Sequence, residues 1–301
     1  MTTFAIAGIQ LDAPVADNLD RIGRQVDRTM ARFPWIQMIL FGELCVFGPR
    51  PSTAQSMPGP AEAHLCGLAR KHGIWLVPGS MYELADGQIF NTSPVIDPTG
   101  EVVARYRKMY PFLPFEKGVA GGAECLVFDV PEVGRFGLSI CYDSWFPETT
   151  RTLAWLGAEV VLHPTLTNTI DRDLELSISR ASAITNQCYF IDINSCGDLA
   201  YGRSLVVGPE GDVIHQAGDA QEIIPVIVDF ARVRRTRRSG LLGMAQPLKS
   251  FRDAGLTYPP YAKGAFSRPL ESLGDLEMPG AGTKKSPSEA DLSVPRIAQG
   301  G

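Results

Sequence analysis

Hydrophobic residues along the chain come in short runs separated by polar turns. Apolar runs predict buried strands at 4–11, 35–43, 74–81, 137–141, 160–163, 189–194 and 223–229. Apolar residues at helical spacing predict helices over 18–32, 60–72, 149–156 and 173–186. Strands that alternate with helices favour an α/β fold with a mixed sheet.

Two Pro-Gly turns predict β-hairpins within this pattern. "VIDPTGEV" begins at Val95 and "VVGPEGDV" begins at Val206, and both place a turn between apolar pairs. Equivalent hairpins in two halves of the fold would explain the similarity. Coincidence would explain it too, since such turns are common.

The chain changes character after Tyr261. Of its 301 residues 45% are hydrophobic, enough for a large core, but residues 262–301 are rich in Gly, Pro, Ser, Lys and Glu. We therefore predict a folded domain over 1–261 and a tail over 262–301, either disordered or wrapped over a neighbouring subunit.

Composition argues against several classes of partner. The net charge of −5 gives no basic field for nucleic acid or anionic membrane, and the arginine run within 232–238 indicates a solvated helix end or a subunit contact. The six cysteines form no C-x-x-C pair or zinc-type spacing, which predicts no metal and a reduced, cytoplasmic compartment. No signal peptide or membrane-spanning run is recognised.

Three residues carry candidate chemistry. Cys141, in "RFGLSICYDSWFPE", stands where a strand meets a sharp turn, a common place for a nucleophile. A lone cysteine there is also often a small buried hydrophobe. Glu43 in "MILFGELCVFGP" and Lys108 in "VVARYRKMYPFLPFE" follow apolar runs, where charged residues are rare unless paired or functional. The combination favours a catalytic site.

Together these motifs resemble the nitrilase superfamily of carbon–nitrogen hydrolases, from the N-terminal strand to about Arg238. "FGELCVFGP", "RYRKMYPFLPFEKG" and "GLSICYDSWFPE" follow the family's Glu–Lys–Cys order, and the second motif is most similar to the aliphatic amidase and formamidase branch. The resemblance implies a four-layer α-β-β-α sandwich that forms homo-oligomers, with a dimer or a larger assembly expected.

The resemblance also implies roles for four residues. Cys141 is the expected nucleophile, Glu43 the general base, Lys108 the oxyanion-stabilising cation, and Glu116 a second carboxylate that holds Lys108 or the substrate nitrogen. The expected reaction is hydrolysis of a small amide to a carboxylate and ammonia through an acyl-thioester, which requires no cofactor.

Pocket residues are assigned by proximity to the motifs. Tyr110, Tyr142, Trp145 and His163 are candidates for binding substrate, as are Phe47 and Phe112, although core packing would explain each of them as well. Trp145 stands where the family's third motif commonly has arginine, which disfavours acidic substrates. Aromatic walls favour a small or apolar acyl group.

Other functions remain open at this stage. A nitrilase or an N-carbamoyl amidohydrolase would use the same trio. A papain-like enzyme would need one of His64, His72, His163 or His215 beside the thiol. A non-catalytic binding protein on the same fold is the alternative from another class.

Overall fold

The computed structural model describes residues 3–113 and 115–276, in two units. The first unit comprises residues 1–112 and 116–255, and the second comprises 113–115 and 256–301. The described part of the second unit contains a 3₁₀ turn, η4 (Pro259–Tyr261), and a short helix, α7 (Arg268–Glu271). The boundary at 261 and the nature of the tail stay predictions, and residues 277–301 lie outside the described residues.

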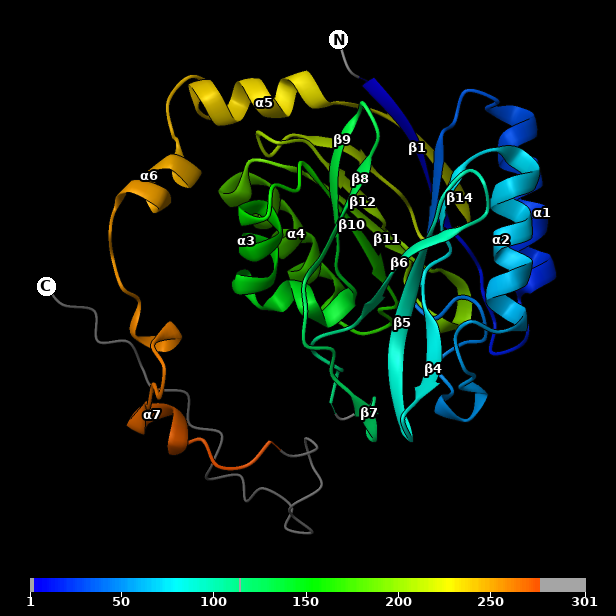
Figure 1. The fold of residues 1–301 in the computed structure, drawn as a ribbon, viewed down its shortest axis with the longest axis horizontal. Helices are drawn as coiled ribbons and strands as arrows, with labels where there is room; N and C mark the ends of the chain where they lie inside the picture. Colours follow the sequence, from blue (N-terminus) through cyan, green and yellow to red (C-terminus); the bar gives the residue numbers. More distant parts are fainter. Residues whose placement is uncertain (1–2, 114, 277–301) are drawn as a thin grey trace, which may run out of the picture. The chain divides into compact units, whose positions relative to one another are not determined.

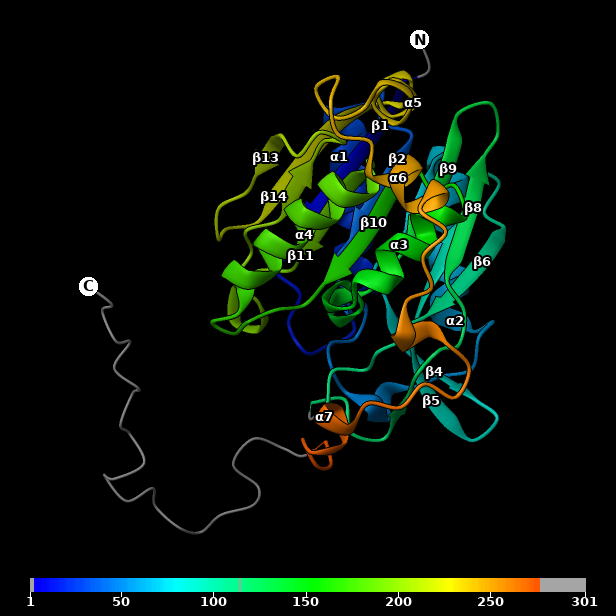
Figure 2. The same ribbon diagram turned by 90° about the vertical axis from the view of Figure 1, so that its left-hand side faces the viewer.

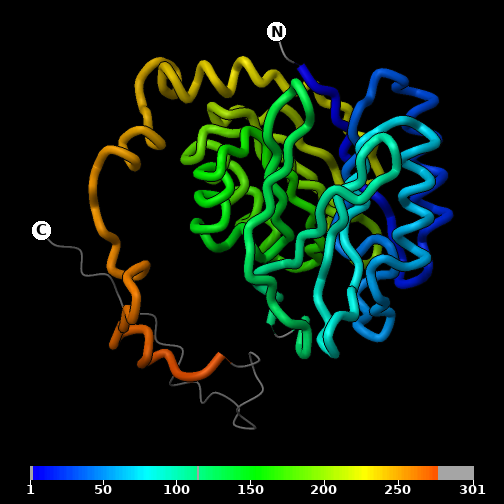
Figure 3. The backbone as a smooth tube through the Cα atoms, in the orientation of Figure 1, coloured from blue at the N-terminus to red at the C-terminus, as the bar shows by residue number. Residues whose placement is uncertain are grey.

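One sheet of the first unit has eight strands, in the order β14-β1-β2-β3-β5-β4, with β6 and β7 both paired to β5. The strands are β1 (Thr3–Gln10), β2 (Met38–Phe41), β3 (Trp75–Val77), β4 (Met81–Ala85), β5 (Gln88–Ile96), β6 (Val102–Arg107), β7 (Val119–Ala120) and β14 (Glu222–Asp229). β1 and β14 run antiparallel side by side along their whole length, so a late strand of the unit lies against its first strand (Figure 3).

The other sheet has six strands, in the order β13-β12-β11-β10-β9-β8. The strands are β8 (Leu126–Val130), β9 (Gly134–Leu138), β10 (Val160–Thr165), β11 (Tyr189–Asn194), β12 (Leu205–Val207) and β13 (Val213–Gln216). β9, β10 and β11 are parallel neighbours. Their carboxyl ends therefore meet at one edge, and the residues that follow them are brought together there.

Helices cover the outer face of each sheet. Figure 1 shows α1 (Leu19–Arg32) and α2 (Pro60–His72) beside the eight-stranded sheet. Figure 2 shows α3 (Pro147–Trp155) and α4 (Arg172–Asn186) over the six-stranded sheet. The remaining elements are α5 (Phe230–Ser239), α6 (Pro247–Asp253), η1 (Pro51–Thr53), η2 (Cys141–Trp145) and η3 (Gly197–Leu199). The predicted four-layer α-β-β-α sandwich is confirmed.

Strand β1 shows why the inner strands are continuous apolar runs. Phe4 and Ile6 join the core between the two sheets, whereas Ala5, Ala7 and Ile9 join the core beneath α1 and α2. Successive side chains point to opposite faces of a strand, so a strand covered on both faces needs apolar residues at every position.

The structure corrects three predicted strand boundaries. The strand predicted at 74–81 was wrong, because Pro78 and Gly79 separate β3 from β4; Gly79 has φ 76°, and a Cβ there would lie 1.8 Å from the Gly42 oxygen. The strand predicted at 137–141 covers 134–138 instead, and the one at 35–43 shortens to β2. The prediction omitted β4, β7 and β8.

Both predicted hairpins are present, one in each sheet. β5 and β6 flank the turn at Asp97–Gly100, and β12 and β13 flank the turn at Gly208–Asp212. This placement agrees with equivalent hairpins in two halves of the fold.

The arginine run lies on α5 and binds its own domain. Arg232 pairs with Asp212 at 2.6 Å, and Arg234 pairs with Glu159 at 2.8 Å. The Arg234 side chain stays 48% exposed despite its ion pair, and the interpretation of the run as a solvated end or a subunit contact stays a prediction. Within the part of the chain that the structure describes, no helix is both long enough and apolar enough to cross a membrane.

Candidate active site

The structure brings Glu43, Lys108 and Glu116 into one buried cluster. The Lys108 ammonium donates to Glu43 Oε1 at 2.8 Å and to Glu116 Oε2 at 2.6 Å. Asn91 Nδ2 donates to both carboxylates, at 2.8 Å to Glu43 and 2.9 Å to Glu116. We call Glu43, Asn91, Lys108 and Glu116 the lysine cluster. Cys141 lies close enough to Glu43 and Lys108 for both charges to shift the pKa of its thiol, so the predicted trio converges.

Local backbone geometry places these groups. Gly42 precedes Glu43 at a close approach between the sheets, where a Cβ would lie 2.7 Å from Ser195 Oγ and 3.0 Å from the Thr165 oxygen. The Glu43 amide donates to that same Thr165 oxygen at 3.1 Å. The next residue, Leu44, has φ 50°, a left-handed conformation that turns the chain directly after the carboxylate.

Cys141 occupies a comparable turn in the other sheet. Its φ is 46°, and the thiol begins the η2 turn after β9. Asp143 holds this turn: its Oδ2 accepts from the Ile140 amide at 2.9 Å and from the Tyr106 hydroxyl at 2.7 Å, and its Oδ1 accepts from the Tyr110 amide at 2.9 Å. Asp143 therefore ties the nucleophile's turn to the segment that carries Lys108.

The charges in the lysine cluster are strongly perturbed. Burial raises the pKa of Glu43, against the opposing charge of Lys108. Burial opposes the charge on Lys108, but Glu43, Cys141 and Glu116 outweigh it and raise the Lys108 pKa well above its usual range. Burial and the Glu43 charge raise the pKa of Cys141, while Lys108 lowers it. Glu43 is thus suited to take up a proton beside a thiol that burial holds neutral.

Aromatic residues gather beside Cys141. The Tyr110 and Phe146 rings stack with centroids 3.5 Å apart, and Tyr142 lies 4.9 Å from Phe112 and 6.0 Å from Trp145. The sequence assigned Tyr110, Tyr142 and Trp145 to the substrate pocket, and the structure places them in this one cluster. Their contact with substrate stays a prediction.

His163 has the surroundings of a core side chain. It is buried in β10, its Nδ1 lies 2.8 Å from Ser139 Oγ, and its ring packs on Phe190 with centroids 5.0 Å apart. Burial lowers its pKa to about 4, which favours a neutral imidazole. Its assignment to the pocket stays a prediction without a contact to support it.

A second buried cluster, absent from the sequence prediction, also lies beside the sulfur. Thr167 Oγ1 is 4.0 Å from Cys141 Sγ and donates to Glu175 Oε1 at 3.0 Å. Arg172 Nη1 donates to Glu175 Oε2 at 3.1 Å and to Asp192 Oδ2 at 3.0 Å. We call Thr167, Arg172, Glu175 and Asp192 the arginine cluster.

Asn91 and Asp143 were also missed by sequence reasoning. Asp143 stands two residues after Cys141, so proximity to the thiol was an available signal. Asn91 is followed in β5 by the polar Thr92 and Ser93, so nothing in the sequence singled it out. Among the residues that the structure describes, Asn91 Oδ1 is a buried acceptor without a hydrogen-bond partner.

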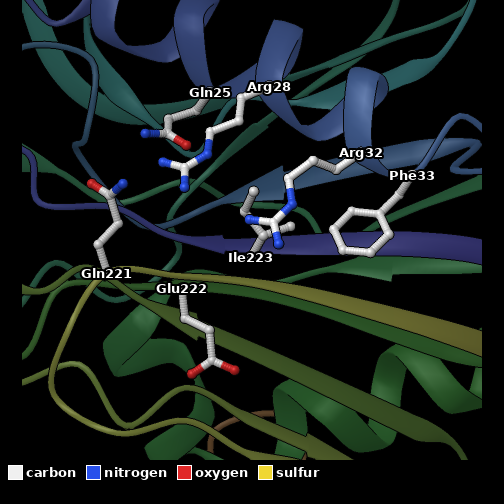
Figure 4. A pocket seen from close by; sticks show the side chains of 7 residues that line it. All are labelled: Gln25, Arg28, Arg32, Phe33, Gln221, Glu222 and Ile223. Atoms are coloured by element: carbon white, nitrogen blue, oxygen red, sulfur yellow. The ribbon is translucent and has the colours of Figure 1, made fainter.

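One surface pocket lies away from this chemistry. It has a volume of about 230 Å³ and contains no thiol (Figure 4). It is lined by residues from the end of α1 and the start of β14: Gln25, Arg28, Arg32, Phe33, Gln221, Glu222 and Ile223. The pocket offers charged and amide side chains, but the nucleophile is elsewhere.

Comparison with known proteins agrees with this geometry. Residues 4–238 match the carbon–nitrogen hydrolase family. Human omega-amidase NIT2 is 31% identical over 258 residues, which cover 79% of this chain and 93% of that protein. Omega-amidase NIT3 of Saccharomyces cerevisiae is 30% identical over 254 residues, which cover 74% of this chain and 86% of that protein.

Solved structures show the same fold. The crystal structure of Saccharomyces cerevisiae Nit3, a nitrilase superfamily member, superposes with a TM-score of 0.73 at 27% identity, covering 79% of this chain and 94% of that one. A mutant amidase from Nesterenkonia sp. AN1, with acrylamide added to its active-site cysteine, gives 0.69 at 29% identity, covering 78% and 97%. The chain belongs to the carbon–nitrogen hydrolase family of the nitrilase superfamily and is a cysteine-dependent hydrolase.

Proposed function

We propose that the protein hydrolyses a small amide to a carboxylate and ammonia, through an acyl-thioester on Cys141. The observation that carries the proposal is the meeting of a thiol, a carboxylate and an ammonium: Glu43 accepts from Lys108 at 2.8 Å, and the charges of both residues shift the pKa of Cys141. All three side chains are less than 10% exposed, so water does not compete for these contacts.

Acylation begins with proton transfer from Cys141 to Glu43. The raised pKa of Glu43 makes it a stronger base than an exposed carboxylate, which favours its role as proton acceptor. The sulfur then attacks the amide carbon, and the carbonyl π electrons move onto oxygen to form a tetrahedral oxyanion. Glu43, now protonated, delivers its proton to the nitrogen as the carbon–nitrogen bond breaks, and ammonia leaves.

Lys108 is proposed to stabilise the oxyanion. An ammonium has three N–H donors, and two of those on Lys108 go to Glu43 and Glu116. The third is assigned to the developing oxygen charge, together with the backbone N–H of Tyr142. Such preorganised donors act strongly where water is excluded.

Glu116 is proposed to fix the ammonium and to complete the second half-reaction. Its Oε2 accepts from Lys108 and also from the Phe112 amide at 2.6 Å, which holds the carboxylate in one orientation. A water that enters after ammonia leaves gives its proton to Glu43 and attacks the thioester carbon. Collapse of that intermediate breaks the carbon–sulfur bond and returns the thiol.

The acyl group is proposed to be small and uncharged. Relatives named omega-amidase and amidase support an amide as substrate. The stacked aromatic rings beside Cys141, and Trp145 in place of an arginine, support an apolar acyl group over an acidic one. A nitrile or an N-carbamoyl amine would use the same trio; carbon dioxide release would identify the carbamoyl case.

The papain-like alternative requires a histidine at the thiol. His163 bonds to Ser139 and packs on Phe190, so it offers that alternative no support. A non-catalytic role would require a thiol that resists electrophiles, which labelling of the intact protein tests directly.

Cys141→Ala tests the proposal. We expect complete loss of ammonia release from a panel of small amides, because no other described group stands in place of the sulfur. The unfolding transition should match the wild type. Mass spectrometry of wild-type protein treated with a poor amide substrate should show an acyl adduct on the Cys141 peptide. Ammonia release retained by Cys141→Ala would refute the mechanism.

We also propose a homo-oligomer. Trp155, Leu156 and Leu174 expose 64%, 40% and 56% of their surfaces on or beside α3 and α4, and a second copy of the chain would cover them. Light scattering measures the mass in solution, and a monomer would contradict this assignment. A cytoplasmic location stays a prediction.

A further inference from the structure

The Cys141 sulfur has a second polar neighbour that the proposed mechanism does not use. Thr167 Oγ1 lies 4.0 Å from Sγ, within the reach of a hydrogen bond to sulfur, and the residue is 5% exposed. Its hydroxyl also contacts Glu175 Oε1 at 3.0 Å. Thr167 therefore stands between the nucleophile and a buried carboxyl group.

The position of Thr167 is fixed by its backbone. Its amide donates to Asn194 Oδ1 at 2.9 Å, and Asn194 Nδ2 donates back to the Thr167 oxygen at 3.1 Å. The Tyr201 amide donates to the same oxygen at 2.9 Å. These contacts hold the backbone on both sides, so the hydroxyl stays between Sγ and Glu175.

Glu175 is placed where it can hold a proton. Arg172 alone faces two carboxylates, Glu175 at 3.1 Å and Asp192 at 3.0 Å, and all three are less than 10% exposed. Ser179 Oγ adds a further donor to Asp192 at 3.0 Å, so Asp192 Oδ2 accepts from both Arg172 and Ser179. Burial raises the pKa of Glu175 to about 7.

A hydroxyl has one hydrogen, so the state of Glu175 decides where it points. When Glu175 is ionised, Thr167 donates to the carboxylate and turns a lone pair toward the sulfur, which disfavours a thiolate. When Glu175 is protonated, the carboxyl O–H can donate to Thr167 Oγ1, and the threonine hydrogen is released to the sulfur. That second arrangement stabilises a thiolate.

We propose that Thr167 hydrogen-bonds the Cys141 sulfur during turnover, and that Glu175 is a positioning residue that sets the direction of the Thr167 hydroxyl. The charged groups that face Glu175 are Arg172 on its own helix, Asp192 from β11 and Cys141 from the η2 turn. The inference rests on the proposed role of Cys141 as nucleophile.

The experiment measures ionisation of the sulfur rather than turnover. Iodoacetamide alkylates the thiolate, so its rate at the Cys141 peptide, followed by mass spectrometry across pH, reports the thiol's titration. The variants are Thr167→Val, Thr167→Ser, Glu175→Gln and the Thr167→Val/Glu175→Gln double variant. Thr167→Ser keeps the hydroxyl and serves as the matched control.

At pH below about 7, where Glu175 is protonated, Thr167→Val should slow alkylation of Cys141 by about tenfold, the loss expected for one hydrogen bond to a charged group. The alkylation rate of Thr167→Ser, which keeps the hydroxyl, should stay within about twofold of the wild-type rate. Glu175→Gln should speed alkylation, because the amide N–H₂ donates permanently to Thr167 Oγ1 while its oxygen accepts from Arg172. It also removes a negative charge near the sulfur.

The double variant separates these two effects. If Glu175 acts through the hydroxyl, the increase caused by Glu175→Gln must shrink in the Thr167→Val background. Equal increases in both backgrounds would show that Glu175 acts by charge alone and would overturn its positioning role. An unchanged rate in Thr167→Val would overturn the bond to sulfur.

These outcomes are distinct from failure of the proposed function. Alkylation needs no substrate, so it can report the bond even if the substrate class is wrong. Retained turnover in Cys141→Ala would remove the mechanism, whereas an unchanged Thr167→Val profile would remove only this inference. Thermal unfolding checks each variant, and Thr167→Ala takes the place of Thr167→Val in the cycle if the valine variant does not fold.

Discussion

The lysine and arginine clusters have the same charge content, and both lie beside one sulfur. Each contains one cation between two buried carboxylates, with ion-pair distances of 2.6 to 2.8 Å for Lys108 and 3.0 to 3.1 Å for Arg172. Glu43 and Lys108 of the lysine cluster shift the pKa of Cys141 by their charges, whereas the neutral hydroxyl of Thr167 is the group of the arginine cluster that lies 4.0 Å from the sulfur.

The choice of cation explains this difference in use. Lysine carries a compact charge with three rotatable donors, while arginine has a rigid planar fork. Both terminal nitrogens of Arg172 hydrogen-bond to fixed partners. Nη1 donates to two carboxylates, and Nη2 donates to the Arg203 oxygen at 3.0 Å. Lys108 keeps a donor that can turn toward a charge that forms during reaction. Equal charge therefore supports chemistry in one cluster and a fixed framework in the other.

Removing each cation gives the largest expected effect. Lys108→Met and Arg172→Met each leave two buried carboxylates without a counter-charge. We expect each variant to lose about 3–5 kcal/mol of unfolding free energy, measured by urea denaturation. The two clusters should be alike in this respect, and a loss in one variant only would break the comparison.

The turnover numbers of Lys108→Met and Arg172→Met should differ, in contrast to their stabilities. At a temperature where both variants are folded, Lys108→Met should lower the turnover number by at least about 10² to 10³, because an oxyanion donor is lost. Arg172→Met should lower it far less, since the fork does not face the reacting carbon. An equal loss of turnover in folded Arg172→Met would show that the arginine cluster also takes part in the chemistry.

The sequence predicted the three charged residues of the lysine cluster and missed the arginine cluster for a physical reason. Glu43 and Lys108 follow apolar strands, where a charge is conspicuous. Arg172 and Glu175 lie on a helix with charged neighbours, and only the tertiary fold shows that their face is buried. Asp192 did carry the conspicuous signal, because it interrupts the apolar strand "YFIDIN".

The pH dependence of the unfolding free energy tests the charge state of Glu175 in the arginine cluster. Burial raises the pKa of Glu175 from 4.5 to about 7 in the folded protein, so the folded state holds this proton more tightly than the unfolded state does. Stability from this group is present below pH 4.5 and is lost as the pH rises through 7. The shift corresponds to about 3 kcal/mol.

The matched measurement compares wild type with Glu175→Gln from pH 4.5 to 8. The amide does not titrate, so the difference in unfolding free energy isolates Glu175 from other titrating groups such as Asp143 and His163. Wild-type stability should fall relative to the variant as the pH rises. A difference that stays constant would mean that Glu175 keeps an ordinary pKa and that Arg172 neutralises it fully.

Backbone details of the site lay beyond sequence reasoning as well. The left-handed conformations at Leu44 and Cys141 arise where strands end against the opposite sheet. Neither leucine nor cysteine is a residue type that predicts such a conformation. Asn91 belongs to the lysine cluster only because β5 lies where its amide meets both Glu43 and Glu116. Motifs along the chain identified the reacting groups, whereas the residues that orient them depend on contacts between distant strands.

The smallest expected effect compares the neutral donors of the two clusters. Asn91→Ala removes one amide that bridges two carboxylates, and we expect about 2 kcal/mol of lost stability. Ser179→Ala removes one donor to Asp192, and we expect about 1 kcal/mol, because Arg172 still neutralises that carboxylate.

The kinetic constants of Asn91→Ala and Ser179→Ala show whether each donor affects the reaction or only the stability. Without Asn91, Glu43 loses the contact that orients it beside Cys141, so the turnover number should fall while the Michaelis constant changes little. Ser179 reaches the sulfur only through Asp192, Arg172, Glu175 and Thr167, and its variant should keep both constants near wild type. If Ser179→Ala lowered turnover as much as Asn91→Ala, the arginine cluster would act on the reaction through its whole network, and Thr167 would be only its nearest member.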